Sequence, residues 1–237
     1  MSDIWTMIWK ESKEFLFSGG RSNFLQPLLI SAILGIVLPL SFTQHWLTLE
    51  PAPILIILYT PFLFITSFIG DAIAGERERH TLETLLASRI SDRAILFGKL
   101  LTAVGFTWGI TLFSLLLGAV VINLSQGLEQ WVFYAPINLF LVVLVMSFLS
   151  ILLAASGGVL ISLKSATARQ AAQMMVLGEL ILGFAVYGVV SLLPDSVTAS
   201  LTTSQVVLII MLVLVILDTI LIGASLASFQ RSRLILD

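Results

Sequence analysis

The sequence predicts an all-α membrane protein with six transmembrane helices, an N-terminal amphipathic interfacial helix and a short cytoplasmic helix between the second and third spans. Two observations predict this fold class. Of the 237 residues, 58% are apolar and only 11% are charged, whereas a soluble domain usually carries about 25% charged residues. The few basic residues are also confined to alternate connections between long apolar segments. Most of the chain is therefore expected to face lipid or other helices.

The first element, residues 3–17, is predicted to lie on the membrane surface. Ile8 and Phe15 fall on one apolar stripe of a helix, whereas Lys10 and Lys13 fall largely on the opposite face. Tryptophan flanks the stripe, and tryptophan is enriched where the headgroups meet the hydrocarbon. This pattern is typical of a helix that lies flat in the interface.

Six segments are predicted to cross the bilayer. A spanning helix needs about 20 largely apolar residues to cover about 30 Å of hydrocarbon. The segments that meet this requirement run over residues 24–42, 54–74, 94–122, 132–163, 171–193 and 206–229. Together they indicate one transmembrane domain over residues 1–237. In the third span we expect Asp92 to cap the start of the helix and Lys99 to extend back to the headgroups.

The distribution of basic residues predicts which side each connection faces. Of the 12 Lys and Arg residues, 11 fall in the N-terminal segment, between spans two and three, between spans four and five, or after span six, and Lys99 lies just inside the start of span three. The other connections, around residues 45–53, 123–130 and 194–205, contain none. Because Lys and Arg mark the cytoplasmic side, we expect a multi-pass protein of the cytoplasmic (inner) membrane with both termini in the cytoplasm.

The most polar stretch, residues 75–89, lies between spans two and three and is predicted to form a short cytoplasmic helix. Leu82, Leu85 and Leu86 would form a small apolar face, beside charged residues at helical spacing. A solvated connecting helix and a docking element for a cytosolic partner both fit this composition.

The order of residues here resembles the permease subunits of type-2 ATP-binding-cassette (ABC) transporters. The likeness is carried by Glu-Arg-Glu-Arg at 76–79, Thr-Leu-Glu at 81–83, Leu-Leu-Ala at 85–87, Ile-Ser at 90–91 and Gly-Lys-Leu at 98–100. The resemblance implies that residues 75–89 are the coupling helix that docks into the ATPase. The residues that it assigns to this contact are Glu76, Arg77, Glu78, Arg79, Thr81, Leu82 and Glu83.

The resemblance also implies the partners of the chain. They are a cytosolic ABC ATPase subunit, a second permease copy or a paralogue that completes a dimer, and the lipid bilayer. ATP and magnesium would be bound by the ATPase, so this chain is expected to hold no cofactor. The direction that the resemblance implies is export.

Catalysis by the chain itself is not expected. There is no Cys and there are only two His, which excludes a thiol nucleophile, a disulfide framework and a Cys-ligated metal centre, and leaves too few ligands for zinc. Gly98-Lys99 is followed by Leu100, so no P-loop is present. A net charge of −2 gives no reason to expect nucleic-acid binding. We therefore predict a non-enzyme with no catalytic or metal site.

Two acids inside the predicted spans are candidate functional residues, because a carboxylate is expensive in lipid. Glu179 in span five and Asp218 in span six are expected at similar depth, with no basic residue at that level. Either they line a translocation path, or they are neutral and hydrogen-bonded to neighbours such as Thr219, Ser191 and Tyr187. Asp71, near the cytoplasmic end of span two, is expected to meet water or a nearby arginine.

Two other function classes fit parts of this pattern. One is a secondary transporter driven by an ion gradient, with Glu179 and Asp218 carrying the ions. The other is a non-transporting membrane scaffold. Gly105 and Gly109 form a GxxxG pattern in span three, which we expect to serve internal packing or a dimer interface.

Overall fold

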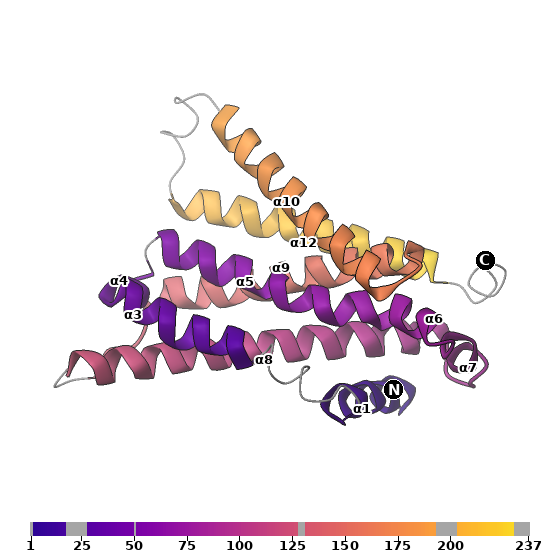
Figure 1. Cartoon of the computed structure of the whole chain (residues 1–237). Coiled ribbons are helices and arrows are strands. Elements are labelled where there is room, and N and C mark those ends of the chain that lie inside the picture. The colour runs from indigo at the N-terminus through magenta and orange to yellow at the C-terminus, as the bar shows by residue number, and fades with distance from the viewer. Residues whose placement is uncertain (1, 18–27, 50, 128–130, 193–202, 230–237) are drawn as a thin grey trace. The chain divides into compact units, whose positions relative to one another are not determined.

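The computed structural model describes residues 2–17, 28–49, 51–127, 131–192 and 203–229 (Figure 1). Within these ranges the chain forms helices and short connections, without a strand, which confirms the all-α prediction. The beginning of the predicted first span at residues 24–27 and the outer connection at residues 194–202 lie outside the described residues.

The helices follow one another along the chain with short connections. They are α1 (Ser2–Phe17), η1 (Ile33–Val37), α3 (Leu38–Phe42), α4 (Gln44–Leu47), α5 (Pro51–Gly70), η2 (Asp71–Gly75), α6 (Glu76–Glu78), α7 (Leu82–Leu86), α8 (Asp92–Gln126), α9 (Ile137–Lys164), α10 (Ala168–Leu192) and α12 (Thr203–Ser228). The η elements are π-helical turns.

Several of these helices can cross a membrane. Among the described residues, four are long and apolar enough, and a shorter apolar helix covers Leu28–Phe42. The four are Pro53–Glu78, Asp92–Gln126, Ile137–Lys164 and Gln205–Ser228. This supports a multi-pass membrane protein.

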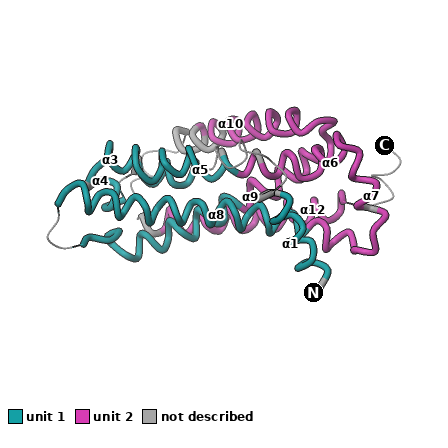
Figure 2. Tube along the Cα trace, turned by 60° about the horizontal axis from the view of Figure 1, so that its bottom comes forward, with its two compact units in different colours: residues 1–64, 97–151 teal, residues 65–96, 152–237 magenta. Residues whose placement is uncertain are grey.

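The chain divides into two compact units (Figure 2). The first comprises Met1–Phe64 and Phe97–Ile151, and the second comprises Ile65–Leu96 and Leu152–Asp237. Helices α5, α8 and α9 contribute residues to both units. We describe each unit by itself.

The core of the first unit contains a hydrogen-bonded aromatic pair. Trp46 is fully buried, and its indole Nε1 donates to the hydroxyl of Tyr134 at 3.1 Å. That hydroxyl in turn donates to the carbonyl of Leu115 on α8 at 2.9 Å. The ring of Tyr134 stacks on Phe140, with centroids 4.7 Å apart. Because both polar atoms have partners, the large aromatic surfaces are buried without an orphan donor.

The second unit is organised around the C-terminal half of α9. Gly158 lets two neighbours approach closely, since a Cβ there would lie 2.5 Å from Met175 Cε of α10 and 2.6 Å from Ile69 Cγ2 of α5. On α12, Ser225 donates to the carbonyl of Ser156 at 3.1 Å. Small residues on α9 therefore give α5, α10 and α12 close access to one helix.

A serine side chain explains the π-helical turn η2. The hydroxyl of Ser162 on α9 accepts from the backbone N–H of Ala74 at 3.0 Å and donates to the carbonyl of Gly70 at 3.2 Å. In a regular α-helix these two backbone groups would bond to each other. The inserted hydroxyl replaces that bond, which is a recognised cause of local widening in a helix.

Candidate functional site

The cytoplasmic segment that follows η2 is not one continuous helix. We expected a single short helix over residues 75–89, but α6 ends at Glu78, and His80 has a φ of 56° before α7 begins at Leu82. A left-handed residue cannot continue a right-handed helix. The backbone N–H of Thr81 closes this turn by donating to the carbonyl of Glu76 at 2.9 Å.

Arg77 attaches the segment to the corner between α9 and α10. Its guanidinium donates to the carbonyl of Ser165 at 2.7 Å and to the carbonyl of Leu163 at 3.0 Å. The last carbonyls of a helix lack intrahelical partners, and a cation near them interacts favourably with the helix dipole. The arginine therefore completes the end of α9 with a forked, charge-assisted contact.

Glu78 and Arg79 make two further attachments. A carboxylate oxygen of Glu78 accepts from the backbone N–H of Ala168, the first residue of α10, at 3.2 Å. The guanidinium of Arg79 donates to both oxygens of Asp71 at 3.0 and 3.1 Å, which confirms the expectation that Asp71 meets a nearby arginine. Each attachment lies within the second unit.

Burial divides the predicted coupling residues into two groups. Glu76 and Leu82 are buried, with 3% and 5% of their surface exposed, and Arg77 is half-buried. Four others, Glu78, Arg79, Thr81 and Glu83, are exposed.

Two exposed residues of the segment were not singled out from the sequence. They are His80 and Thr84, which lie at i, i+4 spacing. Their position opposite the predicted leucine face was the signal in the sequence for their exposure. The outer surface of the segment, formed by His80, Thr81, Glu83 and Thr84, is called the cytoplasmic ridge below.

The start of α8 is capped by Ser91 and not by Asp92. The hydroxyl of Ser91 accepts from the backbone N–H of Ala94 at 3.3 Å, and its carbonyl accepts from the N–H of Ile95 at 3.0 Å. Serine is among the favoured residues at this position. Asp92 instead occupies the first turn, where a negative charge favours the helix dipole.

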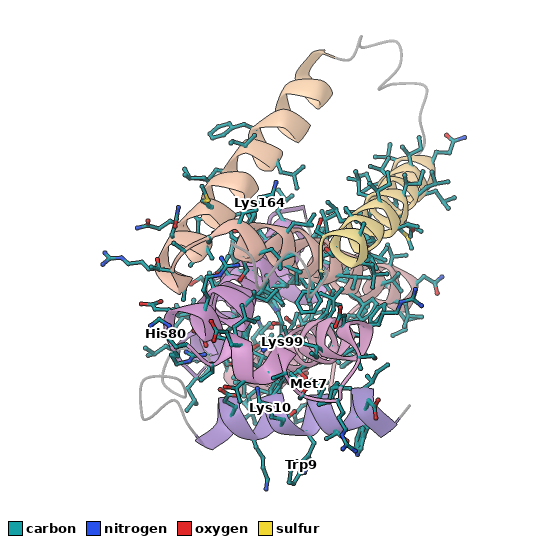
Figure 3. The ribbon with its side chains drawn as sticks, turned by 90° about the vertical axis from the view of Figure 1, so that its right-hand side faces the viewer. Met7, Trp9, Lys10, His80, Lys99 and Lys164 are labelled. Atoms are coloured by element: carbon teal, nitrogen blue, oxygen red, sulfur yellow. The ribbon has the colours of Figure 1, made fainter. Side chains whose placement is uncertain are left out.

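In the first unit, α1 docks onto α8. Met7 is fully buried, and a Cβ at Gly98 would lie 2.5 Å from Met7 Cβ, so glycine is needed for this close approach. Figure 3 shows Met7 pointing toward the body of the unit while Trp9 points away. The expectation for Lys99 was wrong: its ammonium does not extend to the headgroups but binds Glu11 of α1 at 2.9 Å, with the side chain 2% exposed.

The two membrane acids lie in the second unit, on α10 and α12. Glu179 is 9% exposed and Asp218 is 3% exposed. Among the described residues, none of their four carboxylate oxygens has a hydrogen-bond partner. Thr219 is exposed and donates to the carbonyl of Val215 at 2.7 Å. The side chains of the other two expected neighbours, Ser191 and Tyr187, lie outside the described residues.

The glycines of the GxxxG pattern are not used in packing within the described part of the chain. Gly105 and Gly109 are both exposed, and a Cβ at either would meet no atom within 4 Å. The expectation of internal packing is therefore not met, and this flat face of α8 stays open.

Comparison with known protein families assigns the chain to a class. A family model described as ABC-2 type transporter matches residues 2–184, which include α1, the cytoplasmic segment and most of the apolar helices. A search of curated proteins found no match. Permease domains of this family are not themselves ATPases and bind no cofactor, and the family implies an ATPase partner. The chain belongs to the ABC-2 type transporter family and is a membrane-spanning permease of an ABC transporter.

Proposed function

We propose that this permease exports its substrate from the cytoplasm, driven by a separate cytosolic ATPase that binds the cytoplasmic ridge. The observation that carries the proposal is that the segment is bonded to the membrane helices and at the same time presents exposed side chains. On the inner side, Arg77, Glu78 and Arg79 are held by α9, α10 and Asp71 at 2.7 to 3.2 Å. On the outer side, the ridge residues are exposed. A partner that moves the ridge would pull on several spans together.

The seven residues implied by the family resemblance take different parts in this proposal. Thr81 and Glu83 would touch the ATPase directly, together with His80 and Thr84. Buried Glu76 and Leu82 would support the ridge from below. Arg77, Glu78 and Arg79 would transmit the displacement to the membrane helices, because they form hydrogen bonds with residues of η2, α9 and α10 and of the turn between the last two.

The translocation path is proposed to pass Glu179 and Asp218. Buried carboxyl groups without hydrogen-bond partners are costly in a membrane and are functional candidates for that reason. Both lie about 15 Å from the cytoplasmic ends of their helices at about 1.5 Å per residue, which is near the middle of the hydrocarbon.

A complete transporter is proposed to contain two permeases and two ATPases in the inner membrane, with both termini of each permease in the cytoplasm. The second permease is another copy of this chain or a paralogue. The open glycine face of α8 at Gly105 and Gly109 supports this proposal, since small residues let two membrane helices approach closely. The confinement of basic residues to alternate connections supports the orientation.

The coupling is tested by co-expressing the chain with a P-loop ATPase encoded beside it and measuring co-purification and ATP hydrolysis. Glu83→Lys is expected to weaken association by about tenfold or more, because a charge reversal at a docking surface opposes the complementary charge of the partner. Lys164→Glu is the matched control, since Lys164 is also an exposed charge near the cytoplasmic end of a span. Association that is unchanged in Glu83→Lys would contradict the docking assignment.

One observation favours a second function. Two buried, unpartnered acids are also what an ion-driven secondary transporter would need. Transport by the purified permease under an ion gradient alone, without ATPase or ATP, would support that function. Complete dependence on ATP would exclude it, and an assembled complex that transports nothing would indicate a scaffold.

A further inference from the structure

The two membrane acids of the second unit are buried without an ion-pair partner among the described residues. Glu179 and Asp218 are each more than nine-tenths buried, and their oxygens accept no hydrogen bond from any described residue. A polar group in such surroundings is unfavourable unless something binds it. Their surroundings therefore favour the binding of a ligand that can satisfy the two carboxyl groups.

Each acid belongs to the buried stripe of its helix. On α10, the buried positions between residues 171 and 184 are Ala171, Met175 and Glu179, four residues apart. On α12, Asp218 and Ser225 are buried and lie seven residues apart. Residues at these spacings share a helix face, so both carboxyl groups point toward the interior of the second unit, whereas most other residues of the two helices are exposed.

A glycine pair on α9 brings the two stripes to the same level. A Cβ at Gly158 would contact Met175, and one at Gly157 would lie 3.8 Å from Leu221 of α12. Glu179 follows Met175 by one turn, and Asp218 precedes Leu221 by one turn. Because α10 and α12 run in opposite directions (Figure 1), both acids are displaced toward the same end of the unit. They flank one short stretch of α9.

No basic side chain is available to neutralise them. The chain contains no Lys, Arg or His from Gln170 to Phe229, which covers nearly all of α10 and α12, and none from Ile137 to Leu163 in α9. In an apolar environment the attraction of two carboxylates for a positive charge is much stronger than in water. A ligand that binds both carboxylates here would therefore carry a positive charge.

The neighbouring side chains favour an organic cation over a metal ion. Calcium takes six to eight oxygen ligands and magnesium demands near-octahedral coordination, whereas the two acids supply four carboxylate oxygens and the neighbouring Thr219 is exposed. Apolar Met175 and Leu221 adjoin the acids on the same stripes. Two acids among apolar groups suit a ligand with one positive charge on an apolar body.

We propose that Glu179 and Asp218 form a recognition site for amphiphilic organic cations, which are the substrate class of this permease. The proposal rests on the proposed transport function, because it names what passes along the same path. One face of the ligand would contact the carboxylates, and its apolar body would replace lipid contacts along α10 and α12. Neutral and anionic molecules of the same size would be rejected.

Binding to the full-length permease in lipid nanodiscs tests the site. The probe is radiolabelled tetraphenylphosphonium, and triphenylphosphine oxide is the neutral competitor of similar shape. We expect saturable binding that triphenylphosphine oxide and millimolar sodium or calcium do not displace. Glu179→Gln and Asp218→Asn should each weaken it by about tenfold or more, because a charge-assisted contact is lost.

Matched controls exist beside each acid. Gly178→Ala and Thr219→Ala alter exposed neighbours on the same helices and should leave binding unchanged. The proposal is overturned if the probe does not bind saturably, if the acid variants bind as the wild type does, or if calcium displaces the probe. Displacement by calcium would identify a metal site instead.

A second measurement needs no variant. A hydrophobic carbodiimide should label Glu179 and Asp218 in the wild-type chain, and tetraphenylphosphonium should reduce that labelling as read by mass spectrometry. Labelling that the cation does not change would overturn the site. Neither assay contains an ATPase or ATP. A negative result in either would therefore not contradict the proposal that the permease is driven by ATP. Failure of the permease to bind the ATPase would likewise not contradict the proposed cation site.

Discussion

Glu11 on α1 holds the ammonium of Lys99 on α8 at 2.9 Å, and the side chain of Lys99 is only 2% exposed. The same carboxylate lies 3.2 Å from Lys10 on its own helix. Together with the contact of Met7 at Gly98, this pair makes α1 a packed part of the first unit, although Trp5 and Trp9 on the same helix remain exposed.

The first prediction concerns this ion pair. Glu11→Gln should lower the free energy of unfolding by about 2 kcal/mol, because it removes a charged partner from an almost buried ammonium. Thermal unfolding in nanodiscs measures the effect. Glu14→Gln is the control, since the carboxyl group of Glu14 is 40% exposed and pairs with Lys10 at the surface; its cost should be at most about 0.5 kcal/mol. Equal effects of the two substitutions would contradict the buried role of Lys99.

The second prediction compares adjacent glycines of α9. Gly158→Ala should destabilise the chain by about 1 to 3 kcal/mol, because the new methyl group overlaps Met175 and Ile69. Gly157→Ala should be neutral or stabilising by up to about 1 kcal/mol, because it meets only Leu221 at 3.8 Å and alanine favours the helix. Thermal unfolding of both variants checks the order, and a reversed order would show that the packing of α10 on α9 is different.

The third prediction concerns the inserted hydroxyl of Ser162. Ser162→Ala should cost about 1 to 3 kcal/mol, because it leaves the carbonyl of Gly70 and the N–H of Ala74 without their partner. Ser162→Thr retains the hydroxyl and should recover part of the loss. Hydrogen exchange at Ala74 reports the effect directly: faster exchange is expected in Ser162→Ala, and unchanged protection would mean that the π-helical turn does not depend on this side chain.

The fourth prediction separates transmission from docking. Arg77→Lys should reduce ATP-driven transport by about tenfold, because a point-like ammonium cannot reproduce the forked contact with two carbonyls. Association with the ATPase should remain, since Arg77 faces the corner of α9 and α10 and not the ridge. Co-purification measured beside transport distinguishes the two effects. Loss of association in Arg77→Lys would place this residue in the docking surface.

The fifth prediction concerns the open face of α8. Gly105→Leu combined with Gly109→Leu should weaken permease dimers by about tenfold or more if two glycine faces meet, because bulky side chains prevent close approach. Crosslinking in membranes measures the dimer. The folded monomer should be unaffected, since neither glycine has an atom within 4 Å of an added Cβ. Dimers that persist would assign the contact to another helix.

The sequence was sufficient for the helical class and for several apolar helices, and it named an arginine as one of two possible partners of Asp71, because these depend on composition and on local charge. The break at His80 could not be predicted, since a histidine with positive φ carries no periodic signal. The side chains of Lys99 and Ser162 bond to residues about 88 positions away in the chain. Such long-range partners are set by packing and not by local pattern.

The candidate site shows the same division. The sequence indicated the polar segment and both membrane acids from their unusual positions. It did not separate the buried residues of the segment, Glu76 and Leu82, from its exposed ridge, because the turn at His80 changes which faces point outward. For the GxxxG glycines, the sequence left internal packing and a dimer interface open, because small residues permit close packing but do not show which neighbour is there.

Helix α8 has a mechanical consequence of its own. Its 35 residues run without a break from Asp92 to Gln126. At about 1.5 Å per residue the helix is about 50 Å long. A tilt of about 6° would displace its far end by about 5 Å. At that end, the side-chain amide of Asn123 donates to the carbonyl of Val132 and accepts from its backbone N–H, at 2.8 Å each. A small tilt at the Asp92 end of α8 would therefore be carried along the rigid helix to the contact between Asn123 and Val132.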